Sequence, residues 1–216
     1  MTQHSGILAV CQRDAIQGDK MSGRLIYLMG PSGSGKDSVI EAARSALAQV
    51  DVHVARRIIT RSAEAVGEDA VGVGPDTFAR MREAGEFAMN WQANGLQYGI
   101  GADISARLAG GHHVLVNGSR AWLPRALQRY PELLPVLITV DADVLRQRLL
   151  SRGRESLAEI DQRLARNARL QADASEWEEG SVRIEALDNS ADLASAVQRL
   201  LALLARHGIN ATMDRT

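Results

Sequence analysis

GPSGSGKDS is the stretch of sequence that decides the fold, and its nine residues are Gly30, Pro31, Ser32, Gly33, Ser34, Gly35, Lys36, Asp37 and Ser38. A short apolar run, Leu25–Met29, precedes it and is typical of a buried parallel strand. Apolar residues at helical spacing follow it, from Val39 to Leu47. A glycine-rich loop in this setting points backbone N–H groups at an anion, and its lysine reaches the β- and γ-phosphates of a nucleotide. The stretch therefore predicts binding of ATP or GTP, whereas the same motif without the strand and helix could be only a tight turn.

The residue after the lysine departs from the usual form of this motif. That position commonly holds Ser or Thr, whose hydroxyl binds Mg²⁺, but here it holds Asp37. A carboxylate is a harder magnesium ligand than a hydroxyl, so Asp37 could bind the ion directly or through water, with Ser38 in reserve. Alternatively, Asp37 is an acidic residue in the first turn of a helix, where the helix dipole favours it. The sequence leaves both interpretations open.

The composition sets bounds on the class of protein. The chain has 216 residues, of which 45% are hydrophobic and 24% charged, which is enough for one compact core with room for a small inserted subdomain. The net charge of -1 argues against nucleic acid as the main partner, because binding to a phosphate backbone requires a basic surplus. The single cysteine, Cys11, excludes an intramolecular disulfide and fits a reducing cytoplasm. No apolar run approaches membrane-spanning length, so no membrane partner is expected.

The two ends of the chain are expected to lie outside the folded domain, which spans residues 23–207. Residues 1–22 mix polar and small side chains without a sustained period and do not resemble a secretory signal, so we expect a disordered extension. Met21 precedes the first strand by four residues and could be the true start of translation. Residues 208–216 are expected to be a flexible tail.

Strand-like and helix-like stretches alternate along the chain, which predicts an α/β fold with a parallel sheet flanked by helices. Strands are expected at residues 52–55, 113–116, 136–140 and 182–187, and helices at 76–84, 103–109, 123–130 and 193–204. Asp141 is expected to cap one further helix, and the capping box Ser156–Glu159 to open another. Residues 62–100 contain many glycines and little continuous apolar pattern. We therefore expect them to form a loop-rich insertion that binds a second substrate.

Arginines cluster in the last third of the chain, at Arg146, Arg148, Arg152, Arg154, Arg163, Arg166 and Arg169. In a chain without net positive charge, such a cluster predicts that a polyanion binds there. An arginine-rich lid at residues 151–157 would neutralise a phosphoryl group during its transfer. Arg152 and Arg154, which flank Gly153, are the catalytic candidates of this lid, together with Lys36. Alternatively, part of the cluster is a solvated helix face paired with nearby acidic residues.

Several of these motifs resemble the guanylate kinase-like branch of the P-loop kinases, over Leu25 to about Leu204. They are GPSGSGK, the segment RIITR at Arg57–Arg61 followed by Gly67-Glu68, the pair Tyr98-Gly99 and the string RLLSRGR. Residues 69–75, however, contain no aromatic residue of the kind with which guanylate kinases hold the guanine base.

Within that branch, the chain more closely resembles the ribose 1,5-bisphosphate phosphokinase family. This resemblance rests on GPSGSGKDS with its aspartate, W-x-A-N-G-L-x-Y-G at Trp91–Gly99, VLVNGSRA at residues 114–121, LRQRL at 145–149 and RGRE at 152–155. It implies an ATP- and Mg²⁺-dependent kinase that converts ribose 1,5-bisphosphate into 5-phosphoribosyl 1-diphosphate (PRPP) during phosphonate breakdown. It also implies that the adenine lies between the lid and the loop Asp188-Asn189-Ser190, although these residues could equally cap the last helix.

A sugar bisphosphate offers phosphates and hydroxyls but no flat base, so its site requires arginines and other polar groups. The candidate acceptor-binding residues are Arg57, Arg61, Asn94, Tyr98, Asn117 and Arg120. No general base is expected, because the acceptor oxygen belongs to a phosphate that is already ionised at neutral pH. Two other functions are considered: a guanylate kinase, and an inactive interaction module of the same fold, against which the intact Lys36 argues. Trp91 is expected to belong to the core of the insertion rather than to stack on a ligand.

Overall fold

The computed structural model describes residues 23–61, 69–153, 156–176 and 182–210. Five parallel strands form the central sheet, in the order β2-β7-β1-β8-β9. Their bounds are Leu25–Met29 for β1, Val52–Val54 for β2, His113–Asn117 for β7, Leu134–Thr139 for β8 and Glu185–Asp188 for β9. All five residues of β1 are buried, as expected for a parallel strand covered on both faces. The predicted α/β class is confirmed.

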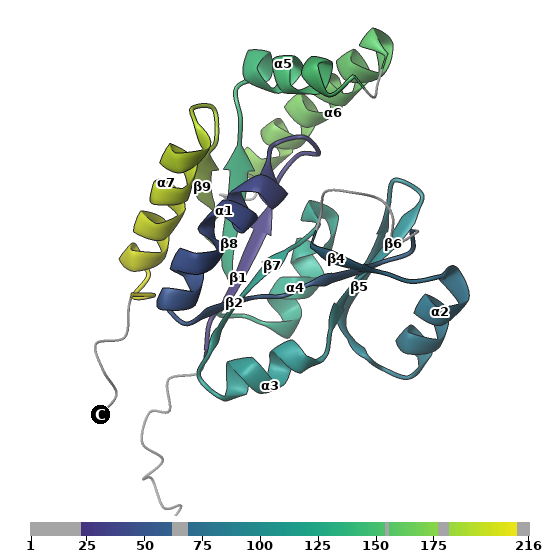
Figure 1. The fold of residues 1–216 in the computed structure, drawn as a ribbon, viewed down its shortest axis with the longest axis vertical. Coiled ribbons are helices and arrows are strands. Elements are labelled where there is room, and N and C mark those ends of the chain that lie inside the picture. Colours follow the sequence, from purple (N-terminus) through teal and green to yellow (C-terminus); the bar gives the residue numbers. More distant parts are fainter. Residues whose placement is uncertain (1–22, 62–68, 154–155, 177–181, 211–216) are drawn as a thin grey trace, which may run out of the picture.

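Helices cover both faces of this sheet (Figure 1). The helices α1 (Lys36–Gln49) and α7 (Leu193–Arg206) pack on one face, and α3 (Asp103–Ala109) and α4 (Leu123–Arg129) pack on the other. Alternate residues of a strand point to opposite faces, so Ile26 and Leu28 of β1 enter the first core whereas Tyr27 enters the second. The central strand thereby joins two hydrophobic cores and holds the phosphate loop at its carboxyl end.

The segment expected to be a loop-rich insertion instead supplies β4, β5 and β6 of a second sheet, in the order β4-β3-β6-β5, and β3 lies just before that segment. The elements are β3 (Arg57–Ile59), β4 (Ala70–Gly72), α2 (Pro75–Glu83), β5 (Phe87–Ala93) and β6 (Leu96–Gly101). Asn94 and Gly95, with φ of 50° and 75°, form the two-residue turn between β5 and β6. This conformation is the one that an Asn-Gly pair favours in a hairpin, so the sequence did contain a signal for these strands. Trp91 is half-buried, stacks on Tyr98 and packs against the second core, so it joins the insertion to the central sheet rather than forming a separate core of the insertion.

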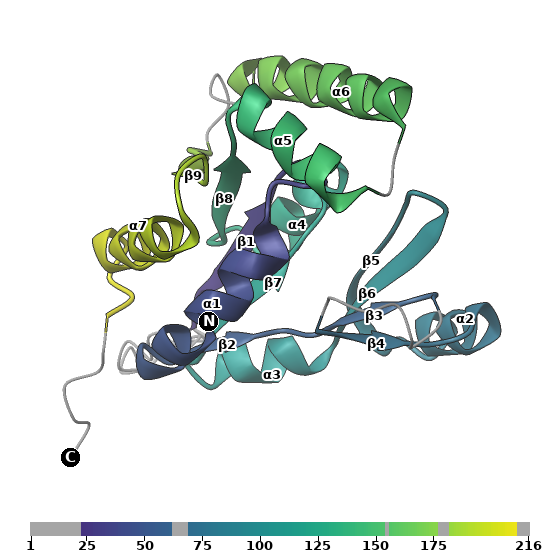
Figure 2. The ribbon, with the colours of Figure 1, turned by 45° about the horizontal axis from the view of Figure 1, so that its top comes forward.

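A short main-chain connection links the two sheets. Only residues 55 and 56 separate the end of β2, in the central sheet, from the start of β3, in the inserted sheet. Figure 2 shows the two strands as one extended ribbon that runs from the central sheet into the insertion. The insertion is therefore attached directly at a strand end and not through a long linker.

The helices α5 (Ala142–Arg152) and α6 (Leu157–Glu176) form a separate layer beyond the carboxyl end of the sheet (Figure 1). The Asp141 side chain accepts from the N–H of Asp143 and caps α5, and Ser156 and Glu159 form the predicted capping box of α6. The predicted final strand is present as β9, but it starts three residues later than expected, at Glu185. Asp192, and not residues 188–190, caps α7.

None of the helices in the described ranges combines the length and apolar character that a membrane span requires.

Candidate active site

The phosphate loop joins β1 to α1 in the predicted conformation. Nζ of Lys36 donates to the carbonyl oxygens of Gly30 and Pro31, each at 2.9 Å. Gly33 and Gly35 adopt φ of 92° and 86°, which is the left-handed region that favours glycine. No side chain within the described ranges caps α1 at Gly35, so the N–H groups of its first turn remain available to an anion.

The side chain of Asn189 donates a hydrogen bond to this loop, a contact that the sequence did not predict. Its Nδ2 donates to the carbonyl oxygen of Ser34 at 2.6 Å, and both residues are buried, with 3% and 0% exposure. A Cβ placed on Gly35 would lie only 2.6 Å from the same nitrogen. Asn189 therefore packs against the loop and fixes the path of its backbone.

Replacing Asn189 with alanine is expected to weaken ADP binding by about tenfold. Leaving a buried carbonyl without its donor costs about 1–3 kcal/mol, and here that cost falls on the phosphate loop. Calorimetric titration with ADP would measure the effect, and Ser190→Ala is the control, because its hydroxyl accepts from the N–H of Asp141 and not from the loop. Unchanged ADP affinity in Asn189→Ala would contradict this role.

Asp188, which precedes Asn189 in the chain, is also fixed by hydrogen bonds. The Ser190 hydroxyl donates to Asp188 and holds the pKa of that carboxyl below its ordinary value, with Arg199 adding a bond at 2.7 Å. Residues 188–190 thus form an ordered turn between β9 and α7.

Two arginines of the cluster reach the phosphate loop. Arg163 of α6 donates from Nη1 to the Ser32 hydroxyl at 2.8 Å. Arg148 of α5 donates to the Ala191 carbonyl at 3.3 Å, and its Nη1 would lie 3.9 Å from a Cβ on Gly35. These two guanidinium groups lie where they could contact the phosphates of a bound nucleotide.

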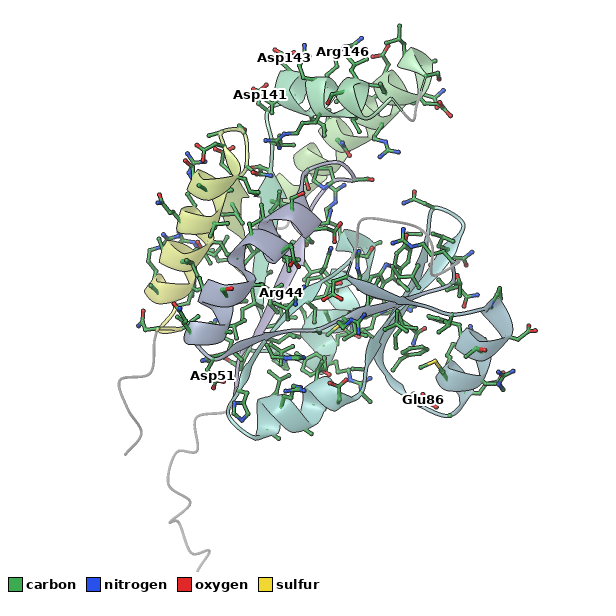
Figure 3. All side chains as sticks on the ribbon, viewed as in Figure 1. Arg44, Asp51, Glu86, Asp141, Asp143 and Arg146 are labelled. Atoms are coloured by element: carbon green, nitrogen blue, oxygen red, sulfur yellow. The ribbon has the colours of Figure 1, made fainter. Side chains whose placement is uncertain are left out.

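Among the other arginines of the cluster, Arg146 forms an exposed ion pair, whereas the side chains of the two lid candidates are not described by the structure. Arg146 forms an exposed pair with Asp161 at 2.5 Å, as the solvated alternative predicted, and lies on the outer side of α5 (Figure 3). The lid candidates are different: Arg152 ends α5, but its side chain and all of Arg154 lie outside the described residues. Sequence spacing did not separate Arg163 from Arg146, because both belong to the same dense run of arginines.

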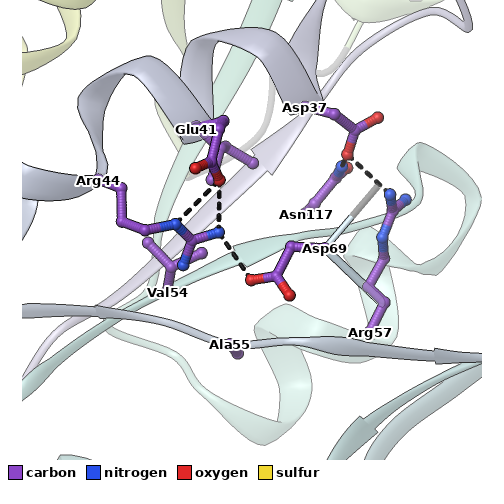
Figure 4. Close-up of a pocket in the computed structure, with 9 residues that line it drawn as sticks. Asp37, Glu41, Arg44, Val54, Ala55, Arg57, Asp69 and Asn117 are labelled. Atoms are coloured by element: carbon purple, nitrogen blue, oxygen red, sulfur yellow. Dashed lines mark hydrogen bonds and ion pairs between the residues drawn. The ribbon is translucent and has the colours of Figure 1, made fainter. Parts of the chain in front are cut away.

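On the other side of the loop, four elements bring polar side chains together around Asp37. Arg57 of β3 donates from Nη2 to Oδ1 of Asp37 at 2.7 Å, and Asn117 of β7 donates from Nδ2 to the same oxygen at 2.8 Å (Figure 4). The guanidinium of Arg57 also lies 6.0 Å from the centre of the Tyr98 ring, on β6. The structure thus joins three predicted acceptor residues to the phosphate loop through one carboxylate.

A pocket of about 410 Å³ opens beside this cluster. Charged and amide side chains line much of it: Asp37, Glu41 and Arg44 of α1, with Arg57, Asp69 and Asn117. Arg44 pairs with Glu41 at 2.9 Å and with Asp69 at 2.7 Å (Figure 4). The sequence did not indicate Glu41, Arg44 or Asp69 as pocket residues. Glu41 and Arg44 form an i,i+3 pair that looks in sequence like an ordinary surface pair, and Asp69 reaches Arg44 only in the fold.

The remaining acceptor candidates are not among the residues that line the pocket. Arg61 follows β3 and is half-buried, Arg120 begins a short 3-10 helix at Arg120–Trp122, and Asn94 is exposed in the hairpin turn. Asn94 is not among the residues that line the pocket, and its left-handed backbone gives it a local structural role.

The residues around Asp37 fit a magnesium ion with its water ligands. The Asp37 side chain is 40% exposed and Asn117 is 5% exposed. Oδ1 of Asn117 is buried and has no hydrogen-bond partner among the described residues, so it could accept from a metal-bound water. Ser38 is exposed on the next position of the helix. The described ranges contain no group of three His, Cys, Asp or Glu residues suited to a metal, so the donor set would be one carboxylate with phosphate and water oxygens.

The loop that follows Asn117 is held firmly against β1. The Tyr27 hydroxyl donates to the Ser119 carbonyl at 2.8 Å, and burial raises the pKa of this hydroxyl above its ordinary value, which keeps it protonated. A Cβ on Gly118 would lie 2.2 Å from the Tyr27 ring. This close contact fixes the position from which Asn117 reaches Asp37.

Known proteins resemble the chain in sequence and in fold. A curated ribose 1,5-bisphosphate phosphokinase PhnN from Pseudomonas fluorescens (strain SBW25) is 58% identical over 191 residues, which cover 88% of this chain and 99% of the relative. The protein of the same name from Azotobacter vinelandii (strain DJ / ATCC BAA-1303) is 53% identical, covering 85% and 97%. A crystal structure of guanylate kinase from Anaplasma phagocytophilum superposes with a TM-score of 0.65 at 16% identity, covering 90% and 89%, and shows likeness of fold alone. A comparison with protein-family models gave no match.

Proposed function

The chain belongs to the ribose 1,5-bisphosphate phosphokinase family, and from this membership we propose that it phosphorylates ribose 1,5-bisphosphate with ATP to give PRPP and ADP. An oxygen of the acceptor's 1-phosphate forms a bond to the γ-phosphorus, while the bond from that phosphorus to the β,γ-bridging oxygen breaks. The supporting observation is a polar, charged pocket that opens directly beside an intact phosphate loop. We also propose, from the family, a place in phosphonate catabolism, and from the single cysteine, a cytoplasmic location.

The nucleotide side of the reaction would use the loop at residues 30–38. Backbone N–H groups of the loop and of the first turn of α1 would hold the β- and γ-phosphates, and the Lys36 ammonium would stabilise charge that develops on the transferred group. Arg148 and Arg163 approach the same loop and would add two further positive charges. Arg152 and Arg154 remain proposed lid residues.

The acceptor side would use the cluster around Arg57 and the pocket beside it. Arg57, Arg61 and Arg120 would bind phosphate oxygens, whereas Tyr98 and Asn117 would donate hydrogen bonds. Asn94, exposed in the hairpin turn, is an acceptor candidate that the pocket does not support. Because the attacking oxygen is ionised already, these side chains have only to align it with the γ-phosphorus. Mg²⁺ bound at Asp37, with Ser38 as a second candidate, would neutralise charge on the β- and γ-phosphates of ATP.

An acceptor assay tests this proposal directly. Purified protein is incubated with ATP and either ribose 1,5-bisphosphate or GMP, and the products are separated by ³¹P NMR. We expect PRPP and ADP from the sugar bisphosphate and little turnover of GMP, because no described aromatic residue lines the pocket to hold a base. Robust turnover of GMP with no PRPP would overturn the proposal in favour of a guanylate kinase, and no turnover of either would favour a non-catalytic protein.

A further inference from the structure

We propose that Asp37 and Asn117 have exchanged the roles that the magnesium-binding residues of P-loop enzymes usually play. In the common arrangement, a neutral hydroxyl follows the lysine and a strand supplies the aspartate. Here the aspartate follows the lysine, and the strand residue that contacts it, Asn117, is a neutral amide. The carboxylate of this pair thus lies on α1 instead of on the sheet.

The sheet places Asn117 where a strand aspartate could serve the phosphate loop. β7 lies beside β1 in parallel register, with Asn117 opposite Leu28, so Asn117 ends its strand level with the start of the loop. Its Nδ2 lies 2.8 Å from Asp37 Oδ1. The assignment of this nitrogen follows from chemistry, because an ionised carboxylate can only accept a hydrogen bond.

The hydrogen bonds to Asp37 leave part of the carboxylate available. Both donors, Arg57 and Asn117, converge on Oδ1, and Figure 4 shows the other oxygen of Asp37 directed away from them. In the same pair, the amide oxygen of Asn117 is buried and has no partner among the described residues. One available carboxylate oxygen of Asp37 and one unpartnered amide oxygen of Asn117 therefore remain as candidate metal ligands or as acceptors for metal-bound water.

Electrostatics explains why the pair carries one carboxylate and not two. An aspartate in place of Asn117 would bring a second negative charge to within hydrogen-bond distance of Asp37, with the Arg57 guanidinium as the positive group bonded to Asp37. Two negative charges at that distance repel each other. We therefore infer that the pair needs one carboxylate, which either position can supply.

Exchanging the two residues tests this inference. The variants Asp37→Asn, Asn117→Asp and Asp37→Asn/Asn117→Asp are compared with the natural chain, and Mn²⁺ binding in the presence of ADP is measured by electron paramagnetic resonance. Asp37→Asn should weaken Mn²⁺ binding by about 10- to 100-fold. The double variant should restore it to within about threefold of the natural chain, because neighbouring substitutions are not additive. Asp143→Asn, which removes an exposed carboxylate from the first turn of α5, is the matched control and should change nothing.

Two results would overturn the inference: Asp37→Asn binding Mn²⁺ as the natural chain does, or a folded double variant that binds it as weakly as Asp37→Asn. Thermal denaturation shows whether each variant folds. If the double variant does not fold, Asp37→Ser/Asn117→Asp is measured in its place, because it places a hydroxyl after the lysine and an aspartate on the strand. The inference rests on the proposed function only for the nucleotide. The Mn²⁺ measurement contains no sugar phosphate, so a failed acceptor assay and a failed exchange are separate results.

Discussion

Replacing Lys36 with alanine is expected to lower kcat/KM by about 10³-fold while the protein remains folded. The ammonium is held at 2.9 Å from two carbonyl oxygens of the loop, at Gly30 and Pro31, so it is oriented before the nucleotide arrives. A positioned charge of this kind acts most strongly when negative charge develops on the transferred phosphoryl group. Steady-state kinetics of ADP formation would measure the loss.

A second variant shows whether charge or packing is responsible. Lys36→Met retains the unbranched stem but has no ammonium, so it should lose as much activity as Lys36→Ala, and both should unfold at nearly the temperature of the natural chain. Undiminished turnover in either variant would remove Lys36 from the catalytic machinery. A large drop in unfolding temperature would instead show that the two hydrogen bonds to the loop stabilise the fold.

The second large effect is expected for Arg57→Ala, which should lower kcat/KM for ribose 1,5-bisphosphate by about 100-fold or more. Its side chain is only 12% exposed while that of its partner Asp37 is 40% exposed, and a hydrogen bond to a charged group contributes about 1.5–3 kcal/mol. The loss would affect the acceptor side and also remove a hydrogen bond from Asp37. Titration with ADP alone, without metal, should show a much smaller change, because the hydrogen bond of Arg57 to α1 goes to the Asp37 carboxylate, a candidate metal ligand.

The neighbouring residue provides the control for this prediction. Arg56→Ala removes a guanidinium that is 58% exposed and pairs with Asp69 at 2.8 Å. Exposed pairs contribute about 0–1 kcal/mol, so kcat/KM should change by less than about fivefold. Equal losses in Arg56→Ala and Arg57→Ala would show that overall positive charge, and not the contact with Asp37, governs acceptor turnover.

The parts of the site that depend on local sequence could be predicted from the sequence. The strand, loop and helix at residues 25–49 are contiguous, and their glycines, apolar spacing and lysine each reflect a local physical requirement. The helix caps at Asp141 and Ser156 were predicted for the same reason. The hairpin of β5 and β6 was missed although Asn94-Gly95 indicated it, because glycines nearby suggested loops throughout the segment.

Contacts between distant parts of the chain could not be predicted in this way. Asn189 reaches Ser34 from 155 positions away, and Arg163 reaches Ser32 from 131 positions away. A single sequence contains no periodic or local signal for such pairs. The same limit explains why Arg44 and Asp69 were not recognised as lining the pocket, since each has an ordinary local context and only the fold brings them together.

The direct continuation of β2 into β3 has a mechanical consequence. Only two residues separate β2 in the central sheet from Arg57, the first residue of β3. The Arg57 guanidinium in turn donates a hydrogen bond to Asp37 on α1. A tilt of the inserted sheet would therefore pull on the first turn of α1, where the triphosphate is expected to sit. If binding of the sugar tilts the inserted sheet, the strand would carry this movement to the nucleotide site. The binding of the two substrates would then be coupled through the main chain itself.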